Sequence, residues 1–202
     1  MDSLIYFISH PEVIIDKNVP VSQWDLSEKG KRRVKHLLTN SWIQSIKLIY
    51  LSNEQKAKTT AHIIRESLKL PIHYREDLRE IDRSATGYLE AQEFERVVNQ
   101  FFANPFQSVR RWEKAVDAQE RIVKAIKNII NEMNNQPILI VSHGGVGALL
   151  MAYLLREPIS RDLDQPGDEG GNYFVFTSLL RLVSKWNPIE KDVLEWPVPP
   201  RK

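Results

Sequence analysis

Two histidines, His10 and His143, each follow a serine at the end of a short apolar run, in the segments SLIYFISHPEV and QPILIVSHGGVGALL. Both runs have the length and the β-branched content that are typical of buried strands. The carboxyl ends of parallel strands in an α/β sheet face the ligand crevice, so we expect both imidazoles at one site. Either histidine alone is explained as an ordinary strand-end residue, but the repeated pattern favours a functional pair.

Imidazoles in such a pair suit chemistry on an anion. A neutral imidazole is a nucleophile near pH 7, and a protonated one donates hydrogen bonds to an anion. The Gly144-Gly145 dipeptide after the second histidine is predicted to open a helix. Exposed amides at a helix N-terminus favour negative charge, so this turn points to the same class of ligand.

The elements that position these residues alternate between strands and helices. Apolar runs predict strands over 45–52 and 70–76 and one or two strands over 172–186, and helical periodicity predicts helices over 26–42, 53–68, 90–102, 112–134 and 144–155. Ser27 is expected to cap the first helix, and Ser52 or Asn53 the second. The alternation predicts a three-layer α/β sandwich with a mostly parallel central sheet between helices.

Length and composition narrow the function classes. The chain has 202 residues, 42% hydrophobic content, a formal net charge of +2 and no cysteine. We expect one domain over 1–202, in which residues from about 84 to 111 form a helical insertion or lid that is too short for a core of its own. The mixed charges argue against a nucleic-acid partner, and the missing cysteine excludes thiolate chemistry and disulfides. No stretch has the length of a membrane span, so a cytoplasmic protein without a membrane partner is expected.

With these motifs in order, the chain resembles the histidine phosphatase superfamily, the phosphoglycerate mutase-like proteins. In that family a first strand ends in Arg-His-Gly, a later turn reads like SSxxxRAxxTA, an acidic residue follows in an LxE context, and a late strand ends in SHGG. The corresponding stretches here are ISHPE, LSNEQKAKTTA, LREIDRS and VSHGGVGALL. The resemblance implies that His10 becomes a phosphohistidine, that His143 stabilises the transferring phosphoryl group, and that Glu80 protonates the leaving oxygen. It implies no metal and no cofactor.

The chain departs from the family pattern around the nucleophile. Ser9 stands where the family has an arginine, Lys56 replaces a second arginine, and Pro11 replaces a glycine. Arginine grips phosphate with two parallel charge-assisted hydrogen bonds, which neither serine nor lysine reproduces. The pocket is therefore expected to bind phosphate more weakly than a standard member does. Ser9, Lys56, Ser52 and Gly144 are the predicted phosphate-binding residues.

Each of the secondary residues also has a simpler explanation. Lys56 has the default role of a solvated lysine, and helix capping alone accounts for Ser52. Glu80 lies in an acidic stretch, with Asp82 as the reserve proton donor. Arg83 and Asp82 are candidate substrate contacts on the lid, although an exposed arginine is the commoner case.

Three functions stay open from the sequence. The leading hypothesis is a metal-independent phosphomonoester hydrolase, or less favourably a mutase, which acts on a small phosphorylated metabolite through His10. The second is a binding or regulatory module on the same fold, which holds a ligand or inorganic phosphate without turnover. A metallohydrolase is the third and weakest, because no His-Glu-x-x-His or comparable spacing is present. The oligomeric state is open, with a homodimer among the alternatives.

Overall fold

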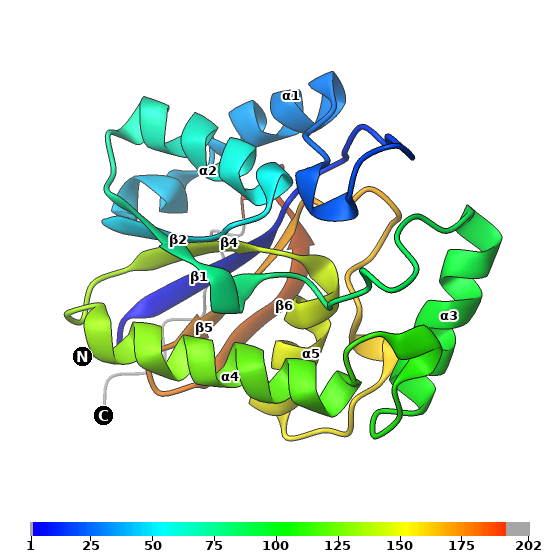
Figure 1. The fold of residues 1–202 in the computed structure, drawn as a ribbon. Helices are drawn as coiled ribbons and strands as arrows, with labels where there is room; N and C mark the ends of the chain where they lie inside the picture. Colours follow the sequence, from blue (N-terminus) through cyan, green and yellow to red (C-terminus); the bar gives the residue numbers. More distant parts are fainter. Residues whose placement is uncertain (1, 193–202) are drawn as a thin grey trace.

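A six-stranded sheet of order β3-β2-β4-β1-β5-β6 forms the centre of the protein (Figure 1), whose computed structural model describes residues 2–192. The strands are β1 (Leu4–Ser9), β2 (Leu48–Ser52), β3 (Ile72–Arg75), β4 (Ile138–Ser142), β5 (Asn172–Thr177) and β6 (Leu182–Pro188). The first four run parallel, β5 is antiparallel to β1, and β6 is antiparallel to β5. The mostly parallel sheet is as predicted, and the segment 172–186 supplies two strands.

Helices cover both faces of this sheet, which completes the predicted three layers. The helices are α1 (Glu28–Leu37), α2 (Gln55–Leu68), α3 (Ala91–Ala103), α4 (Ala115–Glu132) and α5 (Gly144–Leu155). In Figure 1, α1 and α2 lie over one face and α4 and α5 over the other, with α3 beyond the strand ends. Short 3-10 turns fill the connections, namely η1 (Val21–Gln23), η2 (Ser41–Ser45), η3 (Glu76–Leu78), η4 (Val109–Arg111) and η5 (Arg161–Leu163).

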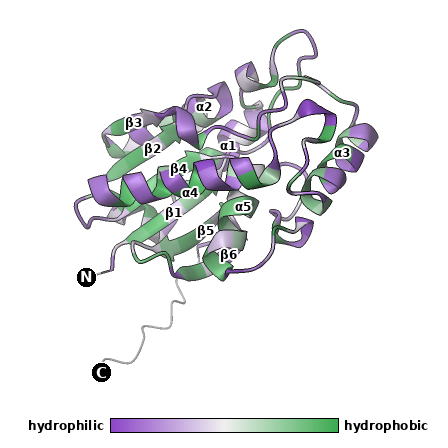
Figure 2. Cartoon of the chain, turned by 60° about the horizontal axis from the view of Figure 1, so that its bottom comes forward, coloured by the Kyte–Doolittle hydropathy of each residue, from purple (hydrophilic) through white to green (hydrophobic). Residues whose placement is uncertain are grey.

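The alternation of side chains along β1 divides the core in two. Ile5 and Phe7 pack with the buried side chains of α3, α4 and α5, whereas Tyr6 and Ile8 pack with those of α1 and α2. Successive strand residues point to opposite faces, so a strand that is apolar on both faces must be covered on both. The strands are accordingly hydrophobic along their length, while α4 shows hydrophilic residues on its outer side (Figure 2).

The helix ends follow the sequence signals in part, since the helix expected over 26–42 ends at Leu37 and Trp42 lies in the separate turn η2. The Ser27 hydroxyl caps α1 by accepting a hydrogen bond from the Gly30 amide at 3.0 Å, as predicted. The predicted cap of α2 was wrong, because Glu54 stands at that position and makes no side-chain capping bond. Ser52 still belongs to β2, so its hydroxyl is directed elsewhere. The tail EWPVPPRK, which we expect to be irregular, lies outside the described residues.

Within residues 2–192, no helix combines the length and the apolar content needed to cross a membrane.

Candidate active site

The two histidines meet because β1 and β4 are adjacent parallel strands in register. Ser9 pairs with Ser142, so His10 and His143 leave the sheet side by side. The His10 amide donates a hydrogen bond to the Ser142 carbonyl oxygen at 3.2 Å. The ring centroids are 5.2 Å apart, and the ring planes make an angle of 68°. The structure thus brings together the two imidazoles that the sequence pattern singled out.

The turn after His10 fixes which ring nitrogen is free. The His10 Nδ1 atom lies 2.9 Å from the Pro11 carbonyl oxygen, which can only accept a hydrogen bond. Nδ1 therefore carries the proton, and Nε2 keeps its lone pair. Burial, the neighbouring His143 and the Lys56 ammonium together place the pKa of His10 well below its ordinary value. His10 is therefore a neutral imidazole at pH 7, with Nε2 as the nucleophilic atom.

His143 is completely buried at the start of α5. Its Nε2 atom lies 2.8 Å from the Ser52 hydroxyl, which also accepts a hydrogen bond from the Glu54 amide at 3.3 Å. Its Nδ1 atom is buried and has no hydrogen-bond partner among residues 2–192. Burial lowers the pKa of His143, against the opposing influence of Glu54 and Glu80. A buried polar atom without a partner is costly, so Nδ1 is the ring atom available to a ligand.

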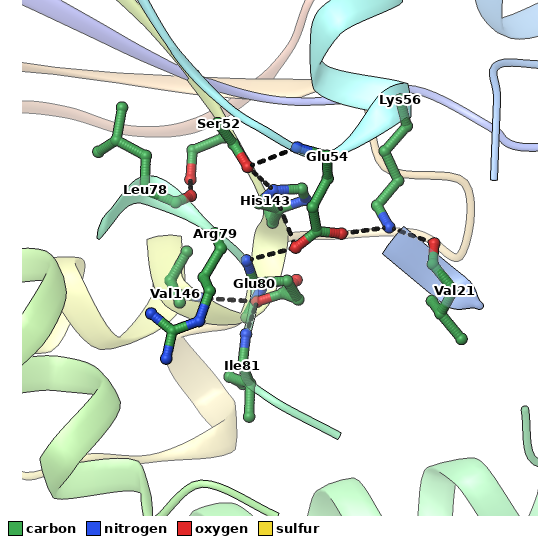
Figure 3. A network of polar contacts seen from close by, with 12 residues as sticks. Val21, Ser52, Glu54, Lys56, Leu78, Arg79, Glu80, Ile81, His143 and Val146 are labelled. Atoms are coloured by element: carbon green, nitrogen blue, oxygen red, sulfur yellow. Dashed lines mark hydrogen bonds and ion pairs between the residues drawn. The ribbon is translucent and has the colours of Figure 1, made fainter. Parts of the chain in front are cut away.

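Lys56 lies in the site, but its charge is already matched (Figure 3). The side chain is buried, and its ammonium forms an ion pair with Glu54 Oε2 at 2.6 Å and donates to the Val21 carbonyl oxygen at 2.8 Å. The other Glu54 oxygen lies 3.6 Å from His143 Nε2 and accepts a hydrogen bond from the Glu80 amide at 2.8 Å. Although burial opposes it, the nearby His143 ring and the Lys56 ammonium hold the pKa of Glu54 below its ordinary value. Glu54 is therefore a carboxylate between two groups predicted to contact phosphate.

Ser9, at the end of β1, is part of a buried hydrogen-bond network. The serine is fully buried, and its hydroxyl donates to Gln165 Oε1 at 2.5 Å. The same hydroxyl accepts a hydrogen bond from the Asn172 amide at 3.1 Å. The Asn172 side-chain amide also donates to Gln165 Oε1, at 3.2 Å. Two donors thus fix the carbonyl end of the Gln165 side chain, which leaves its NH₂ group free for another acceptor.

The Gln165 amide nitrogen lies against the first residue of α5. A Cβ built on Gly144 would approach Gln165 Nε2 to 2.1 Å, and one built on Gly170 would lie 3.8 Å from it. Gly144 therefore contributes by having no side chain, because only glycine lets this amide rest at the helix N-terminus. A Cβ on Gly170 would also lie 2.3 Å from the His10 carbonyl oxygen, which places the Gln165 loop against the nucleophile turn.

The Glu80 carboxylate accepts hydrogen bonds from the backbone amides at the start of α5. It accepts hydrogen bonds from the Gly145 amide at 3.2 Å, from the Val146 amide at 3.0 Å and from the Ile81 amide at 3.0 Å (Figure 3). The anion that the glycine pair attracts is thus a side chain of the protein itself. The Glu80 carboxylate also raises the pKa of His143 and of Arg83, so it lies near both side chains.

Of the two further candidates, Arg83 is half-buried with the charges of Glu80 and Glu54 nearby, and Asp82 is exposed. The Arg83 guanidinium stacks over Phe94 at 4.8 Å, and no hydrogen bond or ion pair to it is found among the described residues. Burial lowers its pKa, against the attraction of Glu80 and Glu54. Asp82 is exposed and accepts a hydrogen bond from the Ser84 amide at 3.0 Å, which lowers the pKa of its carboxyl.

The loop between Pro11 and Asp25 and the segment before α3 contact each other. The Lys17 ammonium forms an ion pair with Glu90 at 2.5 Å and lies 4.7 Å from the centre of the Tyr88 ring. Trp24 packs against the same ring, with centroids 6.1 Å apart. These contacts join the segment after His10 to the approach to α3.

Sequence reasoning missed three polar residues of the site. Gln165 and Asn172 carry no local signal, since they lie 156 and 163 residues from Ser9 along the chain. Glu54 could have been found, because it precedes Lys56 by two residues on the same turn. Within the described part of the chain, no group of three or more His, Asp or Glu side chains has an arrangement that would hold a metal ion.

Comparison with known proteins agrees with this geometry. A model of the histidine phosphatase superfamily (branch 1) matches residues 5–170. No curated protein matches the chain significantly. Among solved structures, YhfR of Bacillus stearothermophilus is 25% identical with a TM-score of 0.70, over 86% of this chain and 90% of that one.

Two further structures share the fold at lower identity. The alpha-ribazole phosphatase of Shigella flexneri is 22% identical with a TM-score of 0.67, over 90% of this chain and 95% of that one. The mycobacterial glucosyl-3-phosphoglycerate phosphatase in complex with inorganic phosphate is 18% identical with a TM-score of 0.69, over 94% and 99%. The histidine pair at the ends of β1 and β4, the order of the elements and the match over residues 5–170 lead to one assignment: the chain belongs to the histidine phosphatase superfamily, branch 1.

Proposed function

We propose that the protein is a metal-independent phosphomonoester hydrolase, which acts on a small phosphorylated metabolite through a phosphohistidine at His10. The observation that carries the proposal is the state of the histidine pair. His10 has its Nδ1 proton committed to the Pro11 carbonyl and a low pKa, so Nε2 is free to attack. The unpartnered His143 Nδ1 atom belongs to a ring 5.2 Å away and is available to the transferring group.

The reaction has two steps. In the first, the His10 Nε2 lone pair forms a bond to phosphorus, the bond from phosphorus to the ester oxygen breaks, and the leaving oxygen takes a proton from an acid. In the second, water attacks phosphorus, the P–N bond breaks, His10 returns to its neutral form and inorganic phosphate leaves. The proton that water loses restores the acid. We assign the acid to Glu80, which lies near His143 and, being a carboxylate in the resting site, takes up a proton before the first step. Asp82 is exposed and accepts a hydrogen bond from the Ser84 amide.

Charge on the phosphoryl oxygens needs donors in both steps. Phosphoryl transfer depends mainly on positioning and on electrostatic stabilisation. The candidate donors are Lys56, Arg83, the His143 imidazole and the Gln165 amide, of which Arg83 has no ion pair among the described residues. Lys56 and Arg83 are cations, whereas the His143 imidazole and the Gln165 amide are neutral donors. We expect this set to hold phosphate less tightly than a pocket in which two arginines each form paired hydrogen bonds to the phosphate. This is why we propose hydrolysis, since a mutase must retain and donate its phosphoryl group again.

The distant structural relatives support a phosphatase on this fold. Two of them are named as phosphatases, one for glucosyl-3-phosphoglycerate and one for alpha-ribazole phosphate. Their organic groups differ, so the fold does not define the substrate. We assign substrate recognition to the joined loops at 11–25 and 84–111, and we propose that the second of these acts as a lid on a single domain.

Turnover of a generic phosphomonoester, with and without a chelator, tests this function. We expect slow hydrolysis that the chelator leaves unchanged and that His10→Ala abolishes, while inorganic phosphate still binds. His36→Ala, an exposed histidine of α1, is the matched control and should keep full activity. Turnover that survives in His10→Ala contradicts the phosphohistidine, and loss on chelation points to a metal-dependent reaction.

A ligand-binding module is the second candidate, favoured by the ion pair of Lys56 with Glu54. In that case phosphate binds but no phosphomonoester in a broad panel is hydrolysed. Trapping of ³²P on His10 separates the two functions, because only the hydrolase forms the covalent intermediate.

A further inference from the structure

The charges of the site cancel inside the protein. Lys56 and Arg83 supply two positive charges, and Glu54 and Glu80 supply two negative ones. Glu80 is satisfied by backbone amides of α5 and Ile81. Glu54 instead takes the ammonium of Lys56 and lies 3.6 Å from the ring of His143. Its side chain is only 13% exposed, so the pair acts where water screens charge weakly.

A phosphoryl group would compete with this carboxylate. The Lys56 ammonium has Glu54 at 2.6 Å and the Val21 carbonyl at 2.8 Å, which leaves one of its three donors for a ligand. A ligand anion beside His143 would also lie near the Glu54 charge, and like charges placed side by side repel each other. Phosphate must therefore displace Glu54 from Lys56 or bind against its repulsion.

We propose that Glu54 is a specificity-determining residue, a built-in counter-ion of Lys56 that weakens the hold of the site on a bare phosphoryl group. Affinity then has to come from the organic part of the substrate, through the loops at 11–25 and 84–111. Binding energy from remote parts of a substrate is available for the reacting centre. The site thereby selects phosphomonoesters with a recognisable organic group over inorganic phosphate and small phosphate esters. This inference rests on the proposed function, in that it takes a phosphoryl group as the ligand.

Glu54→Gln tests the inference, because it removes the negative charge but keeps the hydrogen bond that holds this side chain in the fold. The amide oxygen can still accept the hydrogen bond that the Glu80 amide gives to Glu54 Oε1. Titration calorimetry with inorganic phosphate should show binding about 10- to 100-fold tighter than in the wild type, the equivalent of one additional hydrogen bond to a charged group. Glu66→Gln, an exposed glutamate on α2, changes the net charge equally and should leave the affinity unchanged. A melting temperature close to that of the wild type shows that Glu54→Gln is folded.

The Lys56→Met background identifies the route. If Glu54 acts by neutralising Lys56, the gain from Glu54→Gln should shrink to less than half in Lys56→Met. Unchanged or weaker phosphate binding in Glu54→Gln overturns the inference, and so does a gain that persists in full without Lys56. Failure of the proposed function looks different: Glu54→Gln then binds phosphate more tightly, yet neither protein hydrolyses an ester.

Discussion

The Nδ1 atom of His10 lies 2.9 Å from the carbonyl oxygen of Pro11, the next residue in the chain. The ring of His10, the proposed nucleophile, is therefore oriented by its own turn. Burial and the nearby His143 and Lys56 favour the neutral ring. They outweigh the Pro11 contact, which on its own raises the pKa, so the pKa of His10 lies well below its ordinary value.

The acid limb of the pH profile should reflect this low pKa. We expect kcat/KM for a phosphomonoester to keep most of its value as the pH falls from 8 to 6, because His10 stays unprotonated there. The decline sets in only well below pH 6.5, the ordinary value for histidine. Initial rates in buffers of constant ionic strength measure this pH dependence of kcat/KM. A half-maximal rate at pH 6.5 would show that the imidazole is not protected from protonation.

Stability should depend on pH through His143. Burial lowers the pKa of His143 in the folded protein, so below about pH 6.5 the unfolded chain binds a proton that the folded chain does not. Its stabilising contribution is complete above pH 6.5 and falls as the pH decreases. The free energy of unfolding, measured with urea between pH 7.5 and 5, should fall by up to about 1.4 kcal/mol per pH unit because of this residue. His143→Gln should flatten the slope, and the exposed His36→Gln should leave it unchanged. Equal slopes in all three proteins would contradict the assignment.

Gln165 should donate to phosphate through its amide nitrogen. Gln165→Glu keeps an oxygen that accepts from Ser9 and Asn172 but replaces the free NH₂ group by a second, negatively charged oxygen. We expect phosphate affinity to fall at least about tenfold, the lower end for a hydrogen bond to a charged group, with little change in melting temperature. Asn128→Asp, on the exposed side of α4, adds the same charge and is the control. Affinity that stays at the wild-type value would leave Gln165 with a structural role only.

Gly30 should resist substitution although it lies in a helix. A Cβ on Gly30 would lie 2.3 Å from the Glu12 carbonyl oxygen, a backbone atom that cannot rotate away. Glu12 also receives hydrogen bonds from Ser27, so α1 is fixed to the turn after His10. Gly30→Ala should cost about 1–3 kcal/mol of unfolding free energy by overpacking, despite the better helix propensity of alanine. Arg32→Ala, at an exposed position of α1, should change it by less than about 0.5 kcal/mol. A stabilised Gly30→Ala protein would mean that the loop moves freely.

The sequence predicted what depends on local pattern. The strand ending at Ser9 and the one ending at Ser142 are visible as apolar runs, and parallel pairing then places the histidines together. The Ser27 cap follows from the first turn of α1. The cap of α2 did not follow, because two further residues separate the end of β2 from the helix and Ser52 turns to His143 instead.

The polar surroundings of the histidines needed the three-dimensional structure. Whether Lys56 is solvated or buried depends on Glu54 and on a carbonyl from η1, far away in the sequence. The partner of Ser9 could not be predicted either. It is the Gln165 side chain, which reaches Ser9 because β5 pairs with β1 and holds the loop before it against the end of β1. Contacts between residues so far apart in the chain leave no periodic pattern in the sequence from which they could be predicted.

The tie between Ser9 and Gln165 has a consequence for biosynthesis. Ser9 and His10 are synthesised before the amide that lies beside them, because Gln165 follows Ser9 by 156 residues and β5 comes later still. Chains grow at roughly 5–20 residues per second, so many seconds separate the synthesis of the two halves of the pocket. A nascent chain therefore carries His10 without its surroundings, and the anion site assembles in the last stage of folding, when the loop before β5 docks against β1.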